Sequence, residues 1–225
     1  ERESCGSCGS AALVKILDLG ASPGANAFPV TAHQYADKYP LQMMRCGACG
    51  LAQIGHIVDD EILWRGEYGY YSSTSPALRT HFAAYAKQMM ERYAFDARAL
   101  TIDVGCNDGL LLSHMRDLGA NVFGIDPAKG PLARAREQGL EVEGLALGLQ
   151  VAQSIVAQYG HAGLVLANNV AAHVADIDDF VKGLAYLAGD RGQVVMEVQY
   201  LPDLISGNGF DLLYHEHRYF YTLSS

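Results

Sequence analysis

The side chains best suited to hold a metal ion are four cysteines arranged as two Cys-x-x-Cys pairs, Cys5/Cys8 and Cys46/Cys49. Each pair can supply two corners of a tetrahedral zinc site, and the glycine after each pair lets the backbone turn toward sulfur. A redox site needs only one such pair, and disulfides are disfavoured in the cytosol. Because sulfur fills all four positions, the pattern predicts a structural Zn2+ site with no place for substrate; iron could use the same ligands, but nothing else indicates redox chemistry.

A second chemical motif is the glycine-containing segment 103–109, which lies between a predicted strand and a predicted helix. Gly105 lets the main chain pass close to a ligand, Asn107 tolerates positive φ, and Gly109 allows close packing where the helix starts. The spacing differs from the G-x-G-x-x-G fingerprint that binds a pyrophosphate. Acidic Asp103 and Asp108 favour a cation instead. The segment resembles the Asp-x-Gly-x-Gly/Asn-x-Gly loop of S-adenosylmethionine-dependent methyltransferases, whose cofactor carries a sulfonium and an ammonium group.

The ends of the neighbouring strands supply further candidate cofactor ligands. Asp126, followed by Pro127, ends the second predicted strand of this part and could accept hydrogen bonds from both ribose hydroxyls. The alternative is that Asp126 only caps the following helix. Asn168 and Asn169 end the fourth strand, at the sheet edge where such folds bind ligands, and could reach the cofactor. Cys106 also belongs to the cofactor segment and is predicted to be a small loop residue, not a reactive thiol.

The densest group of proton-transfer side chains is the tetrapeptide Tyr214, His215, Glu216 and His217, which has apolar neighbours on both sides. Three interpretations compete: a polar surface segment, a second metal site in which the two histidines share one face of a strand, and a base with its orienting carboxylate. A base has a clear purpose in methylation at carbon, because an enolate must form first. Transfer to oxygen or nitrogen needs little beyond alignment. His173, just beyond the fourth strand, joins the candidates.

The elements that must position these residues follow from hydrophobic patterning. Ser75 before Pro76 is a good start for a helix, and apolar residues follow at spacings of three and four. Strands are expected at 100–104, 121–125, 141–145, 164–167 and 193–198, and helices at 110–118, 132–138, 149–159 and 178–187. This alternation predicts an α/β domain with a mostly parallel sheet and helices on both faces. Together with the resemblance of the segment 103–109, it implies a Rossmann-like S-adenosylmethionine methyltransferase domain. We expect a small four-cysteine zinc domain over 1–62, an aromatic linker and helix over 63–98, and the cofactor-binding domain over 99–225.

Taken together, the motifs resemble the sugar C-methyltransferases of bacterial deoxysugar pathways, which act on nucleotide-linked 4-keto hexoses. The resemblance covers nearly the whole chain. The matching motifs are the four cysteines, Asp18-Leu19-Gly20, the segment 23–28, Tyr70-Tyr71-Ser72-Ser73, the segment 103–109, Asn168-Asn169-Val170 with His173, and Tyr214–His217.

The resemblance implies a role for each site residue. His217 would be the base that removes a proton next to the ketone, with Tyr214 and Glu216 supporting it. His173 would line the site, and Tyr70 or Tyr71 would contact substrate. The family also implies S-adenosylmethionine as methyl donor and a thymidine-diphosphate sugar as acceptor. Its members continue through another α/β domain that helps to hold the nucleotide sugar, and this domain is absent from the 225 residues.

The composition narrows the kinds of partner and the cellular location that we expect. The formal net charge is −9 and no basic stripe is visible, so we expect no nucleic-acid partner. No apolar run approaches the ~20 residues that cross a bilayer, so we expect no membrane partner and a cytoplasmic protein. Two alternatives stay open: a zinc-ribbon methyltransferase acting on RNA or protein, and an inactive cofactor-binding module. The acceptor sugar, the methylated carbon and the oligomeric state do not follow from the sequence, although a monomer is plausible.

Overall fold

A computed structural model of the chain describes residues 2–25, 31, 36–63, 69–93 and 99–225. The chain forms two compact units. The unit that we call the cysteine unit comprises Glu1–Arg65, Asn169–Asp178 and Val198–Ser225. The sheet unit comprises Gly66–Asn168 and Asp179–Glu197. Each unit is described by itself below.

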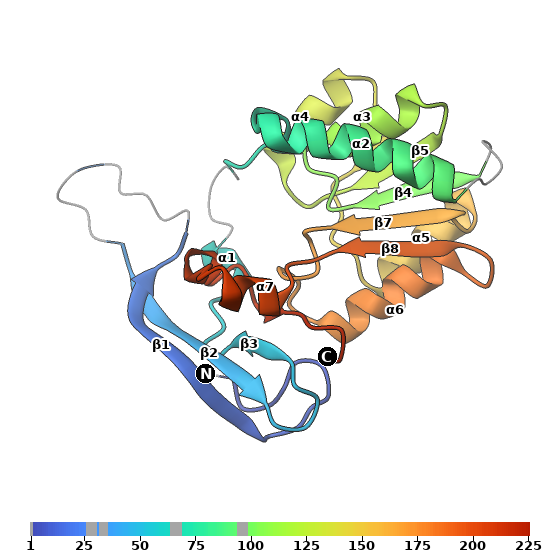
Figure 1. The fold of residues 1–225 in the computed structure, drawn as a ribbon. Coiled ribbons are helices and arrows are strands. Elements are labelled where there is room, and N and C mark those ends of the chain that lie inside the picture. The colour runs from blue at the N-terminus through green and yellow to red at the C-terminus, as the bar shows by residue number, and fades with distance from the viewer. Residues whose placement is uncertain (1, 26–30, 32–35, 64–68, 94–98) are drawn as a thin grey trace. The chain divides into compact units, whose positions relative to one another are not determined.

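The sheet unit is built on a five-stranded sheet in which every pair of neighbouring strands is parallel. Its strands lie in the order β6-β5-β4-β7-β8 (Figure 1). Their bounds are β4 Leu100–Val104, β5 Asn121–Ile125, β6 Val142–Glu143, β7 Leu164–Asn168 and β8 Gln193–Glu197. β4 is buried along its whole length, as expected for a central strand covered on both faces. The carboxyl ends of β4, β5 and β7 carry the predicted cofactor ligands.

Five helices cover this sheet: α2 Pro76–Arg92, α3 Leu110–Asp117, α4 Lys129–Glu137, α5 Leu149–Tyr159 and α6 Ile177–Ala188. Figure 1 shows α2, α3 and α4 on one side of the strands and α5 with α6 on the other. A cluster of buried side chains from α2 and α3, including Phe82 and Met115, packs on Leu164 and Leu166 of β7. The predicted helix start is confirmed, because the hydroxyl of Ser75 accepts a hydrogen bond from the Leu78 N–H. The predicted α/β fold class is therefore confirmed.

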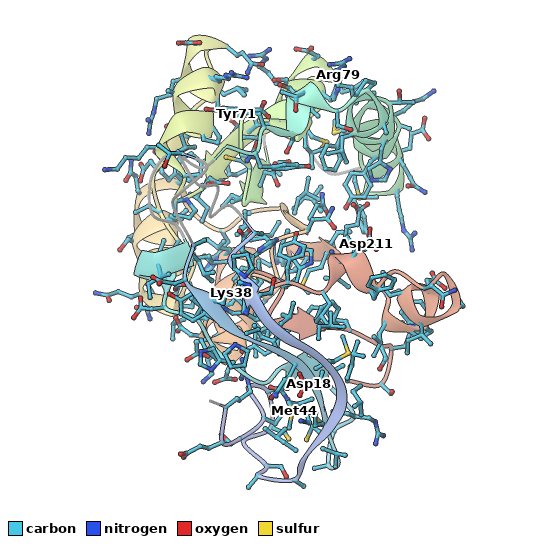
Figure 2. All side chains as sticks on the ribbon, turned by 90° about the vertical axis from the view of Figure 1, so that its left-hand side faces the viewer. Asp18, Lys38, Met44, Tyr71, Arg79 and Asp211 are labelled. Atoms are coloured by element: carbon cyan, nitrogen blue, oxygen red, sulfur yellow. The ribbon has the colours of Figure 1, made fainter. Side chains whose placement is uncertain are left out.

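The cysteine unit contains an antiparallel sheet in the order β1-β2-β3-β9. Its strands are β1 Leu13–Pro23, β2 Lys38–Cys46, β3 Ala52–Ile54 and β9 Tyr219–Phe220, and its helices are α1 Asp60–Leu63, α7 Leu201–Ser206 and the 3-10 turn η2 Phe210–Leu212. The long β1–β2 hairpin, on which Figure 2 labels Asp18 and Met44, did not follow from the sequence analysis. β1 is mostly exposed and carries two register shifts, so its apolar residues do not alternate cleanly.

The compact units differ from the linear division into 1–62, 63–98 and 99–225, because the last strand, β9, pairs with β3 near the start of the chain. The linear boundaries stay a prediction. Parts of two predicted motifs, residues 26–28 and 64–68, lie outside the described residues. Within the residues that the structure describes, no helix is long and apolar enough to cross a membrane.

Candidate active site and metal centre

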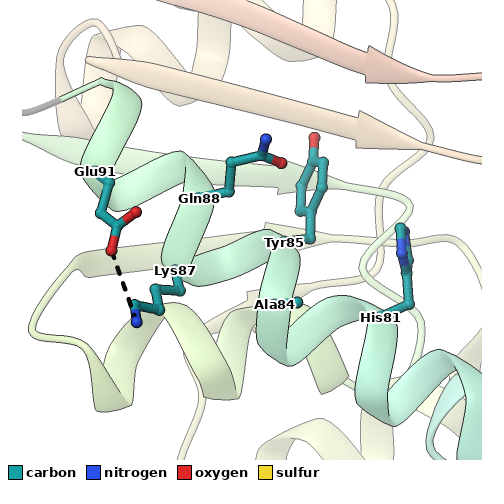
Figure 3. Close-up of a pocket in the computed structure, with 6 residues that line it drawn as sticks. All are labelled: His81, Ala84, Tyr85, Lys87, Gln88 and Glu91. Carbon is teal, nitrogen blue, oxygen red and sulfur yellow. Dashed lines mark ion pairs between the residues drawn. The ribbon is translucent and has the colours of Figure 1, made fainter.

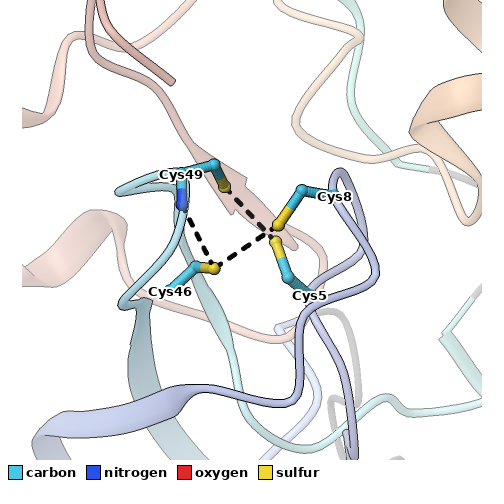
Figure 4. A group of neighbouring side chains, drawn as sticks. All are labelled: Cys5, Cys8, Cys46 and Cys49. Atoms are coloured by element: carbon cyan, nitrogen blue, oxygen red, sulfur yellow. Dashed lines mark hydrogen bonds between the residues drawn. The ribbon is translucent and has the colours of Figure 1, made fainter.

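The four cysteines converge on one point of the cysteine unit (Figure 4). All four sulfur atoms lie within 4.8 Å of one another, and the Cys5–Cys49 and Cys8–Cys46 Sγ distances are both 3.6 Å. Tetrahedral zinc with Zn–S bonds of ~2.3 Å places its sulfur ligands about 3.8 Å apart. The cluster therefore has the size that a zinc ion requires.

The backbone supplies a donor to one of the four sulfur atoms, Sγ of Cys46, whereas burial raises the pKa of the Cys49 thiol to about 12. The N–H of Cys49 points at Sγ of Cys46 at 3.5 Å, and this backbone hydrogen bond lowers the pKa of the Cys46 thiol to about 6. The glycines after the two pairs, Gly9 and Gly50, have φ of 71° and 82°, the left-handed region that favours glycine. The backbone after each Cys-x-x-Cys pair thus turns as the sequence predicted. Among the described residues, this is the one group of three or more potential ligands that could hold a metal ion.

The segment after β4 forms a tight turn whose dihedral angles match the predicted use of its small residues. Gly105, Asn107 and Gly109 all have positive φ, of 75°, 50° and 77°. A Cβ on Gly109 would collide with the side chain of Leu140, so only glycine fits at the start of α3. Cys106 is buried among apolar side chains of this unit, so its thiol packs in the core and can reach a ligand only through its backbone.

Two carboxyl groups lie beneath this turn. Asp103 and Asp126 are buried, with 4% and 7% exposed. Burial, together with the charge of Asp126, raises the pKa of Asp103 to about 8, and burial also raises that of Asp126. A bound cation would stabilise the ionised forms of both groups. Asp126 also accepts hydrogen bonds from the N–H groups of Asn107 and Ala128 at 2.9 and 2.7 Å. Neither N–H belongs to the first turn of α4, whose N-cap is Ala128 and has no side-chain cap, so the alternative helix-capping role is not observed; Pro127 is exposed.

The tyrosine segment of the linker is tied to the cofactor turn by five hydrogen bonds. We call residues 69–74, which include the 3-10 turn η1 Ser72–Thr74, the tyrosine strap. The N–H of Ser72 donates to Oδ1 of Asn107 at 2.9 Å, and Nδ2 of Asn107 donates to the carbonyl oxygen of Tyr70 at 3.1 Å. Ser73 donates to the buried Asp108 carboxylate from its N–H, at 3.3 and 3.2 Å, and from its hydroxyl, at 2.5 Å.

These bonds leave the two candidate tyrosines in different surroundings. Tyr71 lies under the guanidinium of Arg134 at 3.8 Å, which is a cation–π contact. Tyr70 is 49% exposed, and partial desolvation raises the pKa of its hydroxyl. Figure 2 labels Tyr71 together with Arg79, whose guanidinium donates to the carbonyl oxygen of Ser73 at 2.7 Å. Tyr70 is therefore the more exposed tyrosine of this pair.

A surface hollow in the sheet unit is lined by α2 residues (Figure 3): His81, Ala84, Tyr85, Lys87, Gln88 and Glu91. None of these side chains was a predicted site residue. Tyr85 nevertheless holds a predicted ligand, because its hydroxyl donates to Oδ1 of Asn168 at 3.1 Å. Nδ2 of Asn168 is buried without a partner among the described residues. Beside it, His81 contacts Glu197 at 2.6 Å, a pair that the sequence analysis missed.

The candidate base His217 lies in the cysteine unit in a hydrogen-bonded frame. Its Nδ1 is 2.8 Å from the carbonyl oxygen of Leu212, and its Nε2 is 2.8 Å from the hydroxyl of Tyr214. A carbonyl oxygen can only accept, so Nδ1 carries the hydrogen and Nε2 of the neutral ring accepts from Tyr214. Burial lowers the pKa of His217, which favours this neutral form. Nε2 is therefore the nitrogen available as a base.

His173 joins this group, as predicted from its place after the fourth strand. Its ring lies 4.8 Å from that of His217, centroid to centroid, at an interplanar angle of 65°. Burial, followed by the neighbouring His217 and Arg218, lowers the pKa of His173 to about 4. Both rings are thus neutral near pH 7, and they can exchange hydrogen bonds but not supply a fixed positive charge.

The other two members of the tetrapeptide occupy different places from those expected. Residues 214–217 form a turn and not a strand, so His215 and His217 do not share a strand face. His215 is fully buried and its Nε2 is 3.2 Å from the carbonyl oxygen of Pro40, away from the base. The idea of a second metal site at these histidines is not supported among the described residues. Glu216 is buried, but Nδ1 of His217 is held by the Leu212 carbonyl, the position of an orienting carboxylate.

Two partners of the site were missed by the sequence analysis, because neither belongs to a motif. Leu212 contributes only a backbone oxygen, which no side-chain pattern reveals. Gln199 contacts the imidazole of His217, although it lies between β8 and α7 and is 18 residues away in the chain.

Two protein-family models match the chain. Residues 5–64 match a family described as a putative zinc binding domain, and residues 78–225 match a family described as a methyltransferase domain. The first match contains all four cysteines, and the second contains the cofactor turn and both candidate histidines. The fit of the cysteine cluster and the family match agree on a zinc site.

Comparison with curated proteins gives a match along almost the whole chain. The C-methyltransferase NovU of Streptomyces niveus is 27% identical over 225 residues, which is 99% of this chain and 53% of that protein. A ubiquinone biosynthesis O-methyltransferase of Methylobacterium sp. (strain 4-46) is 38% identical over 85 residues, covering 36% of this chain and 33% of that protein. The chain thus spans about half the length of the first relative, and its match to the second covers about a third of that protein.

Among solved structures, an S-adenosylmethionine-dependent methyltransferase of Anabaena variabilis ATCC 29413 matches with a TM-score of 0.51 and 19% identity, covering 64% of this chain and 68% of that one. A protein of Pyrococcus horikoshii OT3 matches with a TM-score of 0.50 and 17% identity, covering 64% and 65%. At this identity the likeness shows the fold alone.

Proposed function

Because the chain belongs to the methyltransferase-domain family, we propose that it is an S-adenosylmethionine-dependent enzyme that methylates a carbon atom of a nucleotide-linked 4-keto deoxysugar. Carbon as the acceptor atom is supported by the candidate base His217, because transfer to oxygen or nitrogen does not require a base of this kind. The 27% identity to a C-methyltransferase over the length of the chain supports the same acceptor atom. The nucleotide, expected to be thymidine diphosphate, rests on the resemblance of the motifs.

The observation that carries this proposal is the frame around His217. A ring nitrogen that lacks hydrogen, at 2.8 Å from a tyrosine hydroxyl, is what removal of a weakly acidic C–H proton requires. The proton next to the ketone would go to Nε2, and the resulting imidazolium would be stabilised through its Nδ1–H by the Leu212 carbonyl oxygen. The hydroxyl of Tyr214 would then be free to donate to the developing enolate oxygen. His173, in its neutral form, would also donate a hydrogen bond toward this oxygen.

The sheet unit supplies residues that fit the cofactor. Asp126 would hold the ribose hydroxyls and Asp103 would face the positively charged methionyl end, with Gly105, Cys106, Asn107 and Gly109 shaping the turn. Burial and the charge of Asp126 raise the pKa of Asp103, so a cation bound beside this carboxyl group would stabilise its ionised form. S-adenosylmethionine, when bound, supplies an electrophilic methyl group on a sulfonium. Pro127, Asn168 and Asn169 stay candidate contacts at the same sheet edge.

Solvent deuterium exchange tests the proposed base. In D2O, a thymidine-diphosphate 4-keto sugar should gain deuterium next to the ketone with the wild-type protein, and a methyl group when S-adenosylmethionine is present; mass spectrometry measures both. His217→Gln should abolish the deuterium exchange while cofactor affinity, measured by calorimetry, is unchanged. His215→Gln, two residues away with its ring toward Pro40, is the matched control and should still exchange.

The outcomes separate the alternatives. Normal exchange in His217→Gln would remove His217 from the role of base. A gain of one methyl group by the wild-type protein without any exchange of carbon-bound hydrogen would indicate transfer to oxygen, and the proposed acceptor atom would be wrong.

A further inference from the structure

The side chain of Gln199 makes an unusual contact with the candidate base. Its Nε2 lies 3.3 Å from Nδ1 and 3.4 Å from Nε2 of His217. The two ring nitrogens flank a single carbon atom. An atom in the ring plane at nearly equal distances from both nitrogens would overlap the ring, so the amide nitrogen of Gln199 lies over the face of the imidazole.

Other groups hold the two ring nitrogens and pack against the ring. Nδ1 donates to the Leu212 carbonyl oxygen and Nε2 lies beside the Tyr214 hydroxyl, each at 2.8 Å. The Tyr214 ring also packs against the imidazole, with 4.0 Å between centroids and 37° between the planes. Phe220 meets the ring edge-on at 6.3 Å between centroids, and His173 approaches at a steep angle. The amide of Gln199 adds a further contact with the ring. The other end of the amide, Oε1, is buried and without a hydrogen-bond partner among the described residues.

We propose that Gln199 is a positioning residue for His217: its carboxamide rests on the imidazole face, keeps the ring in line between Leu212 and Tyr214, and favours the neutral ring over the imidazolium. The proposal rests on the proposed function, in which His217 is the base. Amide hydrogens carry partial positive charge, so over a ring face they act as weak donors to the neutral π system and disfavour a positive ring.

The charged and titratable groups around the ring, on the described elements that pack against it, are His173, Tyr214, Glu216 and Arg218. Arg218 is buried and paired with Asp60, and His173 is neutral near pH 7. Burial already acts against a proton on His217, in the same direction as the amide of Gln199. A variant at residue 199 should therefore change the protonation of His217 without changing the groups that hold its two nitrogens.

Two variants test the proposal, Gln199→Glu and Gln199→Met. The protonation of His217 is followed by NMR of imidazole-labelled protein without any sugar, and the pH profile of deuterium exchange into the keto sugar is recorded separately. A carboxylate at this distance should raise the pKa of His217 by about 1–3 units. The acidic limb of the exchange profile should then move to higher pH by the same amount, with the rate recovering above it. The methionine variant keeps a similar volume without the amide and should give a smaller rise, with a lower rate on the high-pH plateau.

Gln193→Glu, at an exposed glutamine of β8, adds the same charge on the surface of the sheet unit and should leave both measurements unchanged. An unchanged pKa of His217 in both Gln199 variants would overturn the proposal, and so would a fall in rate with no change in the shape of the pH profile. Because the NMR titration needs no substrate, it reports on Gln199 even if His217 proves not to be the base. A failure of the proposed function would appear instead in the exchange experiment with His217→Gln.

Discussion

Replacing Ser73 with alanine should loosen the tyrosine strap from the cofactor turn. The Ser73 hydroxyl donates at 2.5 Å to Asp108, whose side chain is 1% exposed, so water cannot readily take its place. A hydrogen bond to a charged group contributes about 1.5–3 kcal/mol. The two contacts from the Ser73 N–H to the same carboxylate survive the substitution, so we expect a loss near the lower end, about 1.5 kcal/mol.

The strap can open locally, and amide hydrogen exchange of residues 69–75 is therefore the assay. A loss of 1.5 kcal/mol corresponds to about a tenfold faster exchange of these amides if opening is governed by this contact. Ser154→Ala, which removes an exposed hydroxyl bonded within its own helix, is the matched control. The same exchange rates in Ser73→Ala, Ser154→Ala and the wild-type protein would show that the hydroxyl does not hold the strap.

Three further predictions concern the metal, the cofactor turn and pH. Cys46→Ser should lose zinc, measured by elemental mass spectrometry, whereas Cys106→Ala should retain it; retention in both would place the metal elsewhere. Gly109→Ala should reduce the free energy of unfolding by about 1–3 kcal/mol more than Gly139→Ala, because the two residues have similar positive φ, 77° and 73°, but only Gly109 has a side chain in the way of a Cβ; equal losses in urea unfolding would contradict this. Since the pKa of His173 is about 4 in the folded protein and higher when unfolded, the unfolded state binds more protons between these values. Stability should therefore fall as the pH drops from about 6.5 to 4, and less so in His173→Asn; an unchanged pH slope would count against the assignment.

The sheet unit was predictable because its local signals agree with its tertiary structure. Predicted strands 100–104 and 121–125 and predicted helix 149–159 coincide with β4, β5 and α5. In a parallel sheet that is covered on both faces, short buried strands alternate along the chain with amphipathic helices, and glycines mark the turns between them. The cofactor turn could be located for the same reason, since its unusual dihedral angles require glycine or asparagine at fixed positions.

The surroundings of the base were less accessible to sequence reasoning. The histidines were identified by their density. The interpretation as a second metal site required them to share a strand face, whereas they lie on a turn before a strand of two residues. The group that holds Nδ1 is a backbone carbonyl, which any residue can supply. Gln199 gives no pattern at all, because a single glutamine is common and its role depends on a fold that brings segments together.

A short strand links the cysteine cluster to the segment that carries the candidate base. The second cysteine pair lies between β2 and β3, and within the first pair the N–H of Gly6 donates to Oε1 of Gln53 on β3. β3 in turn pairs with β9, and the N–H of Ile54 donates to the carbonyl oxygen of Arg218, the residue after His217. β3 has only three residues, so its own ladder is too short to fix it. Both cysteine pairs border β3. We therefore expect zinc binding to stabilise β3 and, through its pairing with β9, the segment that carries the candidate base.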